Sequence, residues 1–237
     1  MVTRVLKVDL HIHTSDDPVD NIPYSTMELI DRAAQLGYGA VAITLHEKQL
    51  DIRPLVDYAA ERGITLIRGI ERSIEGRHVV LLNFTPATEW VNTFADLAEL
   101  KAREPQGLVV APHPFFPTAF ALREHMDRHA HLFDAVECNA MCTLLLDFNP
   151  KARRWARAHG KPMVGNGDVH RLRQLGSTYS LVDAAPDAGA ICEAIRSGRV
   201  EVRSKPLSVF SAATIMWELV AGDLIKAWIR QLQPGHP

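Results

Sequence analysis

The chain has 237 residues, 47% of them hydrophobic, and is long enough to fold as one large α/β domain with a substantial core. Its formal net charge of -2 argues against a general electrostatic binder of nucleic acid, so we expect no long duplex nucleic acid as a partner. An odd cysteine count, the lack of a signal-peptide pattern and the lack of an apolar run of roughly 18 to 20 residues predict a cytoplasmic protein that is not integral to a membrane.

Short apolar runs rich in β-branched residues alternate with helical patterns, which is typical of a βα repeat. The expected strands are 5–10, 41–44, 65–70, 79–82, 108–111, 135–136 and 163–164. The expected helices are 25–37, 52–62, 89–101, 119–131 and 150–159, and Ser25 with Glu28 forms a capping box at the start of the first. No linker or internal repeat divides this region, so we predict one α/β domain over 1–205, a closed barrel in preference to a doubly wound sheet.

The segment 206–237 has a different pattern. Its apolar residues predict one helix from about 209 to 231, which would pack on the body or form a homo-oligomer with a second subunit. Attachment to a membrane surface is the less favoured alternative because the charges of this helix are mixed.

Two histidines follow the first expected strand, in the sequence Asp9-Leu10-His11-Ile12-His13-Thr14. Because strand side chains alternate between faces, His11 and His13 project to the same side. Such a pair is typical of a metal site, although alone it is equally typical of ordinary polar residues at a strand end.

Further potential ligands occupy the same position after later strands. His46, Glu71, His113, Asp168 and His170 each follow an apolar run, and His78 begins one. In a βα barrel the carboxyl ends of the strands meet at one rim, so these residues should converge there. Imidazole and carboxylate ligands without thiolate suit Zn, Mn or Fe, while Cys138 and Cys142 lack the spacing of a zinc knuckle.

Five ordered motifs resemble the PHP (polymerase and histidinol phosphatase) family of metal-dependent phosphoesterases. They are Asp9-Leu10-His11-Ile12-His13-Thr14, Ala42-Ile43-Thr44-Leu45-His46, Gly69-Ile70-Glu71, Pro112-His113-Pro114 and Gly167-Asp168-Val169-His170. The resemblance implies a distorted (β/α)7 barrel, here with an added C-terminal helix, and two or three divalent metal ions (Zn, Mn or Fe) at its rim.

The resemblance also implies how the ligands are shared. A first metal would be held by His11, His13, Glu71 and Asp168, and Glu71 would bridge to a second metal held by His78 and His113. A third would use His46, His170 and an acidic residue after His13, for which we take Asp17, with Asp16 and Asp20 left open. Leu45 replaces the usual aspartate of the family before His46, which puts the occupancy of the third site in question.

The predicted function is hydrolysis of a phosphate ester by a hydroxide that bridges two metal ions. The substrate would be a phosphomonoester, a nucleotide or a nucleic-acid end. His170 or Asp168 would assist proton transfer, and Arg171 would contact phosphate in preference to Arg72 and Arg77, with Asn139 a further candidate at the rim.

Two other functions compete with this one. The first is an amidohydrolase acting on a C–N bond. A carboxylated lysine among the metal ligands would favour it, and only Lys48 lies near a motif strand. A non-catalytic, metal-stabilised interaction module would be expected to have lost ligands, whereas every core position here is filled.

Overall fold

The structure is a computed structural model that describes residues 3–215, 217 and 218. Its strands are β1 (Arg4–Asp9), β2 (Ala40–Ile43), β3 (Thr65–Ile74), β4 (Arg77–Leu82), β5 (Leu108–Ala111), β6 (Ala135–Asn139), β7 (Met163–Asn166), β8 (Thr178–Ala184) and β9 (Val200–Ser204). Its α-helices are α1 (Thr26–Gln35), α2 (Val56–Ala60), α3 (Phe94–Arg103), α4 (His125–Arg128), α5 (Asn149–Ala158) and α6 (Ala188–Arg196). Three 3₁₀ helices, η1 (Arg53–Leu55), η2 (Pro86–Trp90) and η3 (Leu172–Gln174), complete the described elements.

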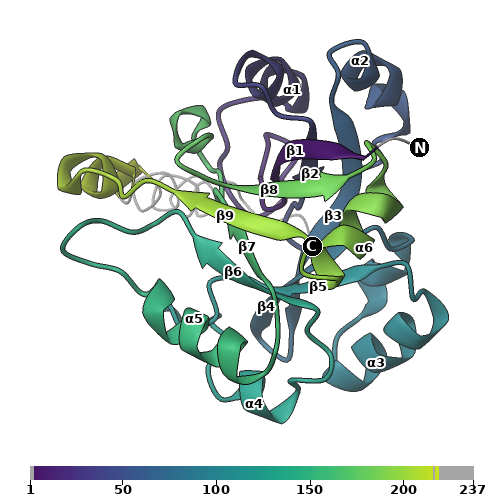
Figure 1. Cartoon of the computed structure of the whole chain (residues 1–237), viewed down its shortest axis with the longest axis vertical. Helices are drawn as coiled ribbons and strands as arrows, with labels where there is room; N and C mark the ends of the chain where they lie inside the picture. The colour runs from purple at the N-terminus through teal and green to yellow at the C-terminus, as the bar shows by residue number, and fades with distance from the viewer. Residues whose placement is uncertain (1–2, 216, 219–237) are drawn as a thin grey trace, which may run out of the picture.

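The nine strands form one sheet in the order β7-β6-β5-β4-β3-β2-β1-β8-β9 (Figure 1). Strands β4 and β8 run antiparallel to their neighbours, and the pairs β1–β2, β2–β3, β5–β6 and β6–β7 are parallel. The sheet curls until β7 approaches β8, where the Gly165 amide donates to Ser180 Oγ at 2.8 Å. A Cβ at Gly165 would lie 2.7 Å from the Tyr179 carbonyl oxygen, so glycine permits this near closure of the barrel.

The hairpin between β3 and β4 has the tightest connection in the barrel. Ile74 pairs with Arg77, which leaves only Glu75 and Gly76 in the turn. Their φ angles of 49° and 75° are both positive, as a type I′ turn requires. The turn therefore fixes the register of the two strands.

Helix α1 shows why the local sequence folds as expected. The Ser25 side chain accepts from the Glu28 amide and the Glu28 side chain accepts from the Ser25 amide, which is the predicted capping box. The face of α1 turned towards the sheet buries Leu29, Ile30 and Ala33. Burial of one apolar stripe on the barrel wall is the main stabilisation of such a short helix.

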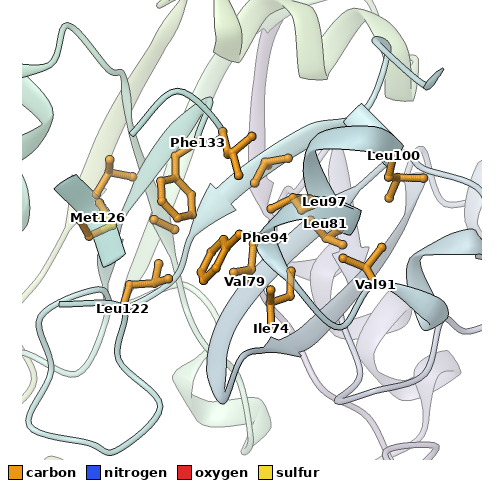
Figure 2. Close-up of a cluster of buried hydrophobic side chains, with 14 of the residues drawn as sticks. Ile74, Val79, Leu81, Val91, Phe94, Leu97, Leu100, Leu122, Met126 and Phe133 are labelled. Atoms are coloured by element: carbon orange, nitrogen blue, oxygen red, sulfur yellow. The ribbon is translucent and has the colours of Figure 1, made fainter. Parts of the chain in front are cut away.

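Apolar clusters fill the barrel and surround it. Inside, side chains from the strands pack against Ile191, Ala194 and Ile195 of α6, which closes the end of the barrel at the amino-terminal halves of the parallel strands. Outside β3, β4 and β5, Phe94 and Leu97 of α3 pack on Val79 and related side chains (Figure 2). Both regions are close-packed apolar cores.

All seven expected strands are present, and the mixed α/β, nearly closed barrel is the fold class that the sequence predicts. The prediction missed β8, α6 and β9, so the count of seven βα units is not reproduced. The expected helix 119–131 is reduced to α4, because the segment before it turns at Arg123, where φ is 47°.

Of the predicted C-terminal helix, residues 209–215, 217 and 218 are helical, and the rest lies outside the described residues. Leu207 bridges to Thr143 and Arg171 contacts Glu218, so the described start of this segment touches the body. The boundary at 206 stays a prediction. Within the described part of the chain, no helix combines the length and apolar character that a bilayer span needs.

Candidate metal centre

The potential ligands predicted from scattered motifs converge at the carboxyl-terminal rim of the barrel. His11 and His13 follow β1, His46 follows β2, Glu71 lies in β3, and His113 follows β5. Backbone bonds fix the spacing of the segments, since the His13 amide donates to the Val169 carbonyl at 3.1 Å and His46 forms a bridge with Glu71. His78 begins β4, and because β4 runs in the opposite direction its start lies at the same rim.

Glu71 is the centre of this cluster and is 1% exposed. Its Oε2 lies 3.1 Å from His11 Nε2, 3.4 Å from His13 Nε2 and 3.1 Å from His46 Nε2. Its Oε1 lies 2.8 Å from His78 Nδ1 and 3.1 Å from His113 Nε2. Each carboxylate oxygen therefore faces its own group of imidazole nitrogens, as expected of a carboxylate that bridges two cations.

Asp168 completes the group around the first histidine pair. Its Oδ1 lies 3.7 Å from His11 Nε2 and 3.6 Å from His13 Nε2, while Asn139 Nδ2 donates to Oδ2 at 3.1 Å. Asn139, named from the sequence as a rim candidate, thus holds a proposed ligand in place.

The donor atoms fit divalent cations. Four overlapping groups place such atoms within 4.8 Å of one another, namely His11-Glu71-His113, His11-His13-Asp168, His13-Asp17-His46 and His46-Glu71-His78. His13 Nε2 and His113 Nδ1 are buried and have no hydrogen-bond partner among the residues that the structure describes. Buried polar atoms without partners are costly, and a bound cation would satisfy the one on His13, which points at Glu71 and Asp168.

The loop after His13 carries the three candidate carboxylate ligands of the third site, Asp16, Asp17 and Asp20, and their contacts differ. Asp17 Oδ2 accepts from His13 Nδ1 at 2.9 Å, from His46 Nδ1 at 3.0 Å and from the His46 amide at 2.9 Å, so it orients two imidazoles from behind. Asp20 Oδ2 lies 2.8 Å from His170 Nε2 and 3.8 Å from His46 Nδ1. Asp16 contacts only Thr14 and Thr26 among the described residues. Asp20 is thus the nearest of the three to His170, whereas Asp17 is shared by His13 and His46.

Two carboxylates that the sequence analysis passed over support the ligands. Glu137, fully buried in β6, lies 2.8 Å from His11 Nδ1 and accepts from the His113 amide and from Asn166. Asp9 accepts from the Gly167 and His11 amides. Carboxylates behind metal-bound imidazoles fix the tautomer and orientation of the ring. Glu137 could have been recognised from the sequence, because it is an acidic residue directly after the apolar pair Ala135-Val136.

The charges of the cluster shift the pKa of its members strongly. Burial would lower the pKa of His46, but the Glu71 and Asp17 carboxylates outweigh it and raise that pKa to about 11. Burial likewise opposes protonation of His13, and the nearby Asp168 and Asp17 carboxylates raise its pKa to about 9. Burial would raise the pKa of Glu71, yet the surrounding imidazoles, His78 and His11 foremost, hold it well below its usual range. The cluster thus attracts positive charge, which protons or metal ions can supply.

Burial raises the pKa of Asp9 to about 7, even though hydrogen bonds from the Gly167 and His11 amides act in the opposite direction.

Two proposed ligands have unusual backbone conformations, since φ is 28° at His113 and 47° at Asp168. Left-handed conformations of residues other than glycine cost of order 1–3 kcal/mol and concentrate at functional sites. Here they turn the chain sharply after β5 and β7 so that both side chains face the cluster.

The arginines named from the sequence are engaged elsewhere. The Arg171 guanidinium contacts Glu218 and the carbonyls of Asn21 and His170. Arg72 pairs with Glu47, and Arg77 donates to the carbonyls of Ala119 and Ala121. A phosphate role for Arg171 stays a prediction that this geometry does not favour.

Comparisons with known proteins agree with the sequence motifs. A model described as PHP-associated matches residues 147–200. The PolC-type DNA polymerase III of Caldanaerobacter subterraneus subsp. tengcongensis is 38% identical over 65 residues, which are 27% of this chain and 5% of that much longer protein.

Among solved structures, a two-domain protein from Bacteroides vulgatus that contains a predicted PHP-like metal-dependent phosphoesterase aligns with a TM-score of 0.66 at 20% identity, over 85% of this chain and 65% of its own. The lesion-specific endonuclease Q of Pyrococcus furiosus aligns with a TM-score of 0.59 at 14% identity, over 90% of this chain and 66% of its own. At these identities the likeness concerns the fold.

Fold and site together define a nearly closed α/β barrel whose rim gathers imidazoles and carboxylates around one bridging glutamate. With the ordered motifs and the matches above, the chain resembles the PHP domain family.

One expectation has to be corrected. Endonuclease Q, which shares this fold, has been solved in complex with a 27-mer duplex substrate with an abasic lesion at the active site, at a TM-score of 0.56 to this chain. The exclusion of long duplex nucleic acid from the net charge of -2 was therefore wrong. A net charge averages the whole chain, whereas binding depends on the charge of one surface.

Proposed function

We propose that this chain is a metal-dependent phosphoesterase that hydrolyses the phosphate ester of a nucleotide or a nucleic-acid strand. The observation that carries this proposal is the position of Glu71, whose two oxygens face separate groups of imidazoles at 2.8 to 3.4 Å. One buried carboxylate between two sets of nitrogen ligands suits a pair of close cations better than it suits a single structural ion.

The residues divide naturally between the cations. His11, His13, Asp168 and Glu71 would hold one, and Glu71, His78 and His113 a second. His46, His170 and Asp20 would hold a third, with Asp17 orienting His46. Divalent ions in such a centre neutralise phosphate charge and lower the pKa of bound water from about 15.7 towards 7.

The remaining chemistry falls to side chains. Asp168 is suited to remain ionised, because the nearby imidazoles of His11 and His13 outweigh its burial and hold its pKa well below the usual range. It is therefore a poor proton donor. His170, whose Nε2 lies 2.8 Å from Asp20, is the better candidate to protonate a leaving oxygen when the third cation is absent.

The amidohydrolase alternative receives no support from the geometry. Its carboxylated lysine would have to enter the cluster, but Lys48 is exposed, and the bridging position is taken by Glu71, which is buried. The assignment to phosphate esters rests on this and on the resemblance to the PHP family.

The test combines metal analysis with turnover. Gently purified protein should carry more than one transition-metal ion per chain and hydrolyse bis-p-nitrophenyl phosphate or p-nitrophenyl phosphate with added Mn²⁺ or Zn²⁺. His113→Ala should lose most of this activity, while His131→Ala, an exposed histidine outside the cluster, should keep it. Absence of bound metal under every loading condition would refute the proposal.

A further inference from the structure

A groove of about 900 Å³ lies beside the metal centre, between α5 and the segment that leads into α4. Its walls include Phe115, Phe116 and Arg123 on one side and Lys151, Arg154 and Trp155 on the other. Figure 1 shows α4 and α5 next to each other at the edge of the barrel, and Trp155 Nε1 donates to Asp127 Oδ1 at 2.6 Å across the gap.

The wall formed by α5 is strongly basic. The helix, Asn-Pro-Lys-Ala-Arg-Arg-Trp-Ala-Arg-Ala, carries four cations and no acidic residue. Lys151, Arg154 and Trp155 lie three and four residues apart, so they share the face towards the groove. Within the described residues, the Arg154 guanidinium makes no hydrogen bond or ion pair, and Lys151 Nζ rests 4.5 Å from the Phe115 ring centroid. These cations are available to a ligand.

Two acidic residues also line the groove, but both already have partners. Asp127 accepts the Trp155 hydrogen bond and lies 3.8 Å from His159 Nε2. Glu124 lies 3.8 Å from Arg77 and from His125. The charge left without a partner in the groove is therefore positive.

Phe116 connects the wall of the groove to the proposed site. The Phe116 amide donates to the His113 carbonyl at 3.1 Å, and the two rings meet edge to face with centroids 6.2 Å apart. Phe116 also packs on Phe148, just before α5, with ring centroids 5.0 Å apart. A chain of aromatic rings thus leads from a proposed metal ligand to the basic helix.

We propose that this groove binds a stretch of single-stranded DNA that continues from the ester held at the metal centre. The inference rests on the proposed function and names its substrate class more narrowly. Cations that follow a backbone, together with aromatic rings on which unpaired bases stack, are the two elements of single-strand binding. Lys151 to Ala158 rise about 10 Å along α5, which spans about three phosphates at the 3.4 Å spacing of a stacked strand.

The experiment measures binding separately from turnover. A fluorescent 12-residue oligodeoxynucleotide with phosphorothioate linkages, which resist cleavage, is titrated with metal-loaded protein and followed by anisotropy. Arg154→Glu should weaken binding about three- to ten-fold at low salt. Lys151→Glu combined with Arg154→Glu should also reduce the slope of log Kd against log salt by about 1.4, since each phosphate contact on a single strand contributes about 0.7.

Arg157→Glu is the matched control, because it makes the same charge change on the same helix at a residue that does not line the groove. It should bind like the wild type. Equal losses of affinity in Arg154→Glu and Arg157→Glu, or no binding by the wild type, would overturn the proposal that the groove binds DNA. Tighter binding of the matching oligoribonucleotide would overturn the assignment to DNA. Turnover of the small nitrophenyl esters tests the proposed function independently, so the two failures can be told apart.

Discussion

The two ends of the barrel are built on opposite principles. At the amino-terminal end, α6 closes the barrel with Ile191, Ala194 and Ile195, which belong to a buried apolar cluster. At the other end, histidines and carboxylates are buried side by side around Glu71. The first end gains stability by excluding water, whereas the second is stable only when its charges are balanced by one another or by bound cations. Substitutions at the two ends should therefore fail in different ways.

The largest effect is expected from Glu71→Gln. Loss of the shared charge removes a ligand from two proposed cations at once, so turnover of a nitrophenyl ester should fall by about three orders of magnitude, the equivalent of about 4 kcal/mol. Metal content per chain, measured by elemental analysis, should fall with it. Glu61→Gln, at an exposed site on the body, should change neither. Full metal occupancy and activity in Glu71→Gln would remove the basis of the site.

Ile195→Ala tests the opposite end. Ile195 is fully buried, and deleting its side chain should cost about 2–5 kcal/mol of unfolding free energy, while Ile195→Val should cost about 0.5–1.5. Urea unfolding measures both values. Metal content should stay at the wild-type level in each variant, and a loss of metal would show that the two ends are coupled.

A smaller effect is expected from Glu137→Gln. The fold of β6 should persist, but the negative charge behind His11 would be gone, so metal affinity or activity should fall about 10- to 100-fold. Competition with a chelator measures the affinity. Glu104→Gln, at a half-buried carboxylate that accepts hydrogen bonds from Thr85 outside the cluster, is the control. Unchanged affinity would mean that Glu137 only fills space.

The smallest effect concerns pH. The pKa values of about 9 for His13 and about 11 for His46 lie above the usual value of about 6.5. Groups with a raised pKa stabilise the folded state fully below about pH 6.5, and this contribution is lost as the pH rises through 9 to 11. Metal-free protein should therefore melt at a lower temperature at about pH 9.5 than at about pH 7. Metal-loaded protein, with neutral imidazoles as ligands, should change less, and an equal response of both forms would contradict this account.

Much of the difference between the two ends of the barrel can be predicted from the sequence, because the carboxyl ends of the strands in a barrel share one rim. His11, His46 and Asp168 could be named from their positions after apolar runs, and His78 from its position before one. The choice between Asp17 and Asp20 could not, since it depends on the path of a loop without regular structure. Strands β8 and β9 were missed because the prediction followed the motifs, which end at His170.

The groove shows a different reason for failure. Its cations on α5 are visible in the sequence, but the expected helix 150–159 was assigned no binding role. That its basic face adjoins Phe116 and His113 depends on how two distant segments pack. A net charge of -2 does not show that positive charges gather on one surface. This explains both the missed groove and the wrong exclusion of duplex nucleic acid.

The hairpin of β3 and β4 has a consequence for how the family can diversify. Most proposed ligands stand next to βα loops, which tolerate insertions and can change length without moving the rim. Glu71 and His78 are instead joined through the two-residue turn at Glu75 and Gly76, where adding or deleting one residue would shift the register and send the His78 side chain to the opposite face. This short segment should therefore be inherited as one indivisible unit, while new substrate preferences arise in the loops around it.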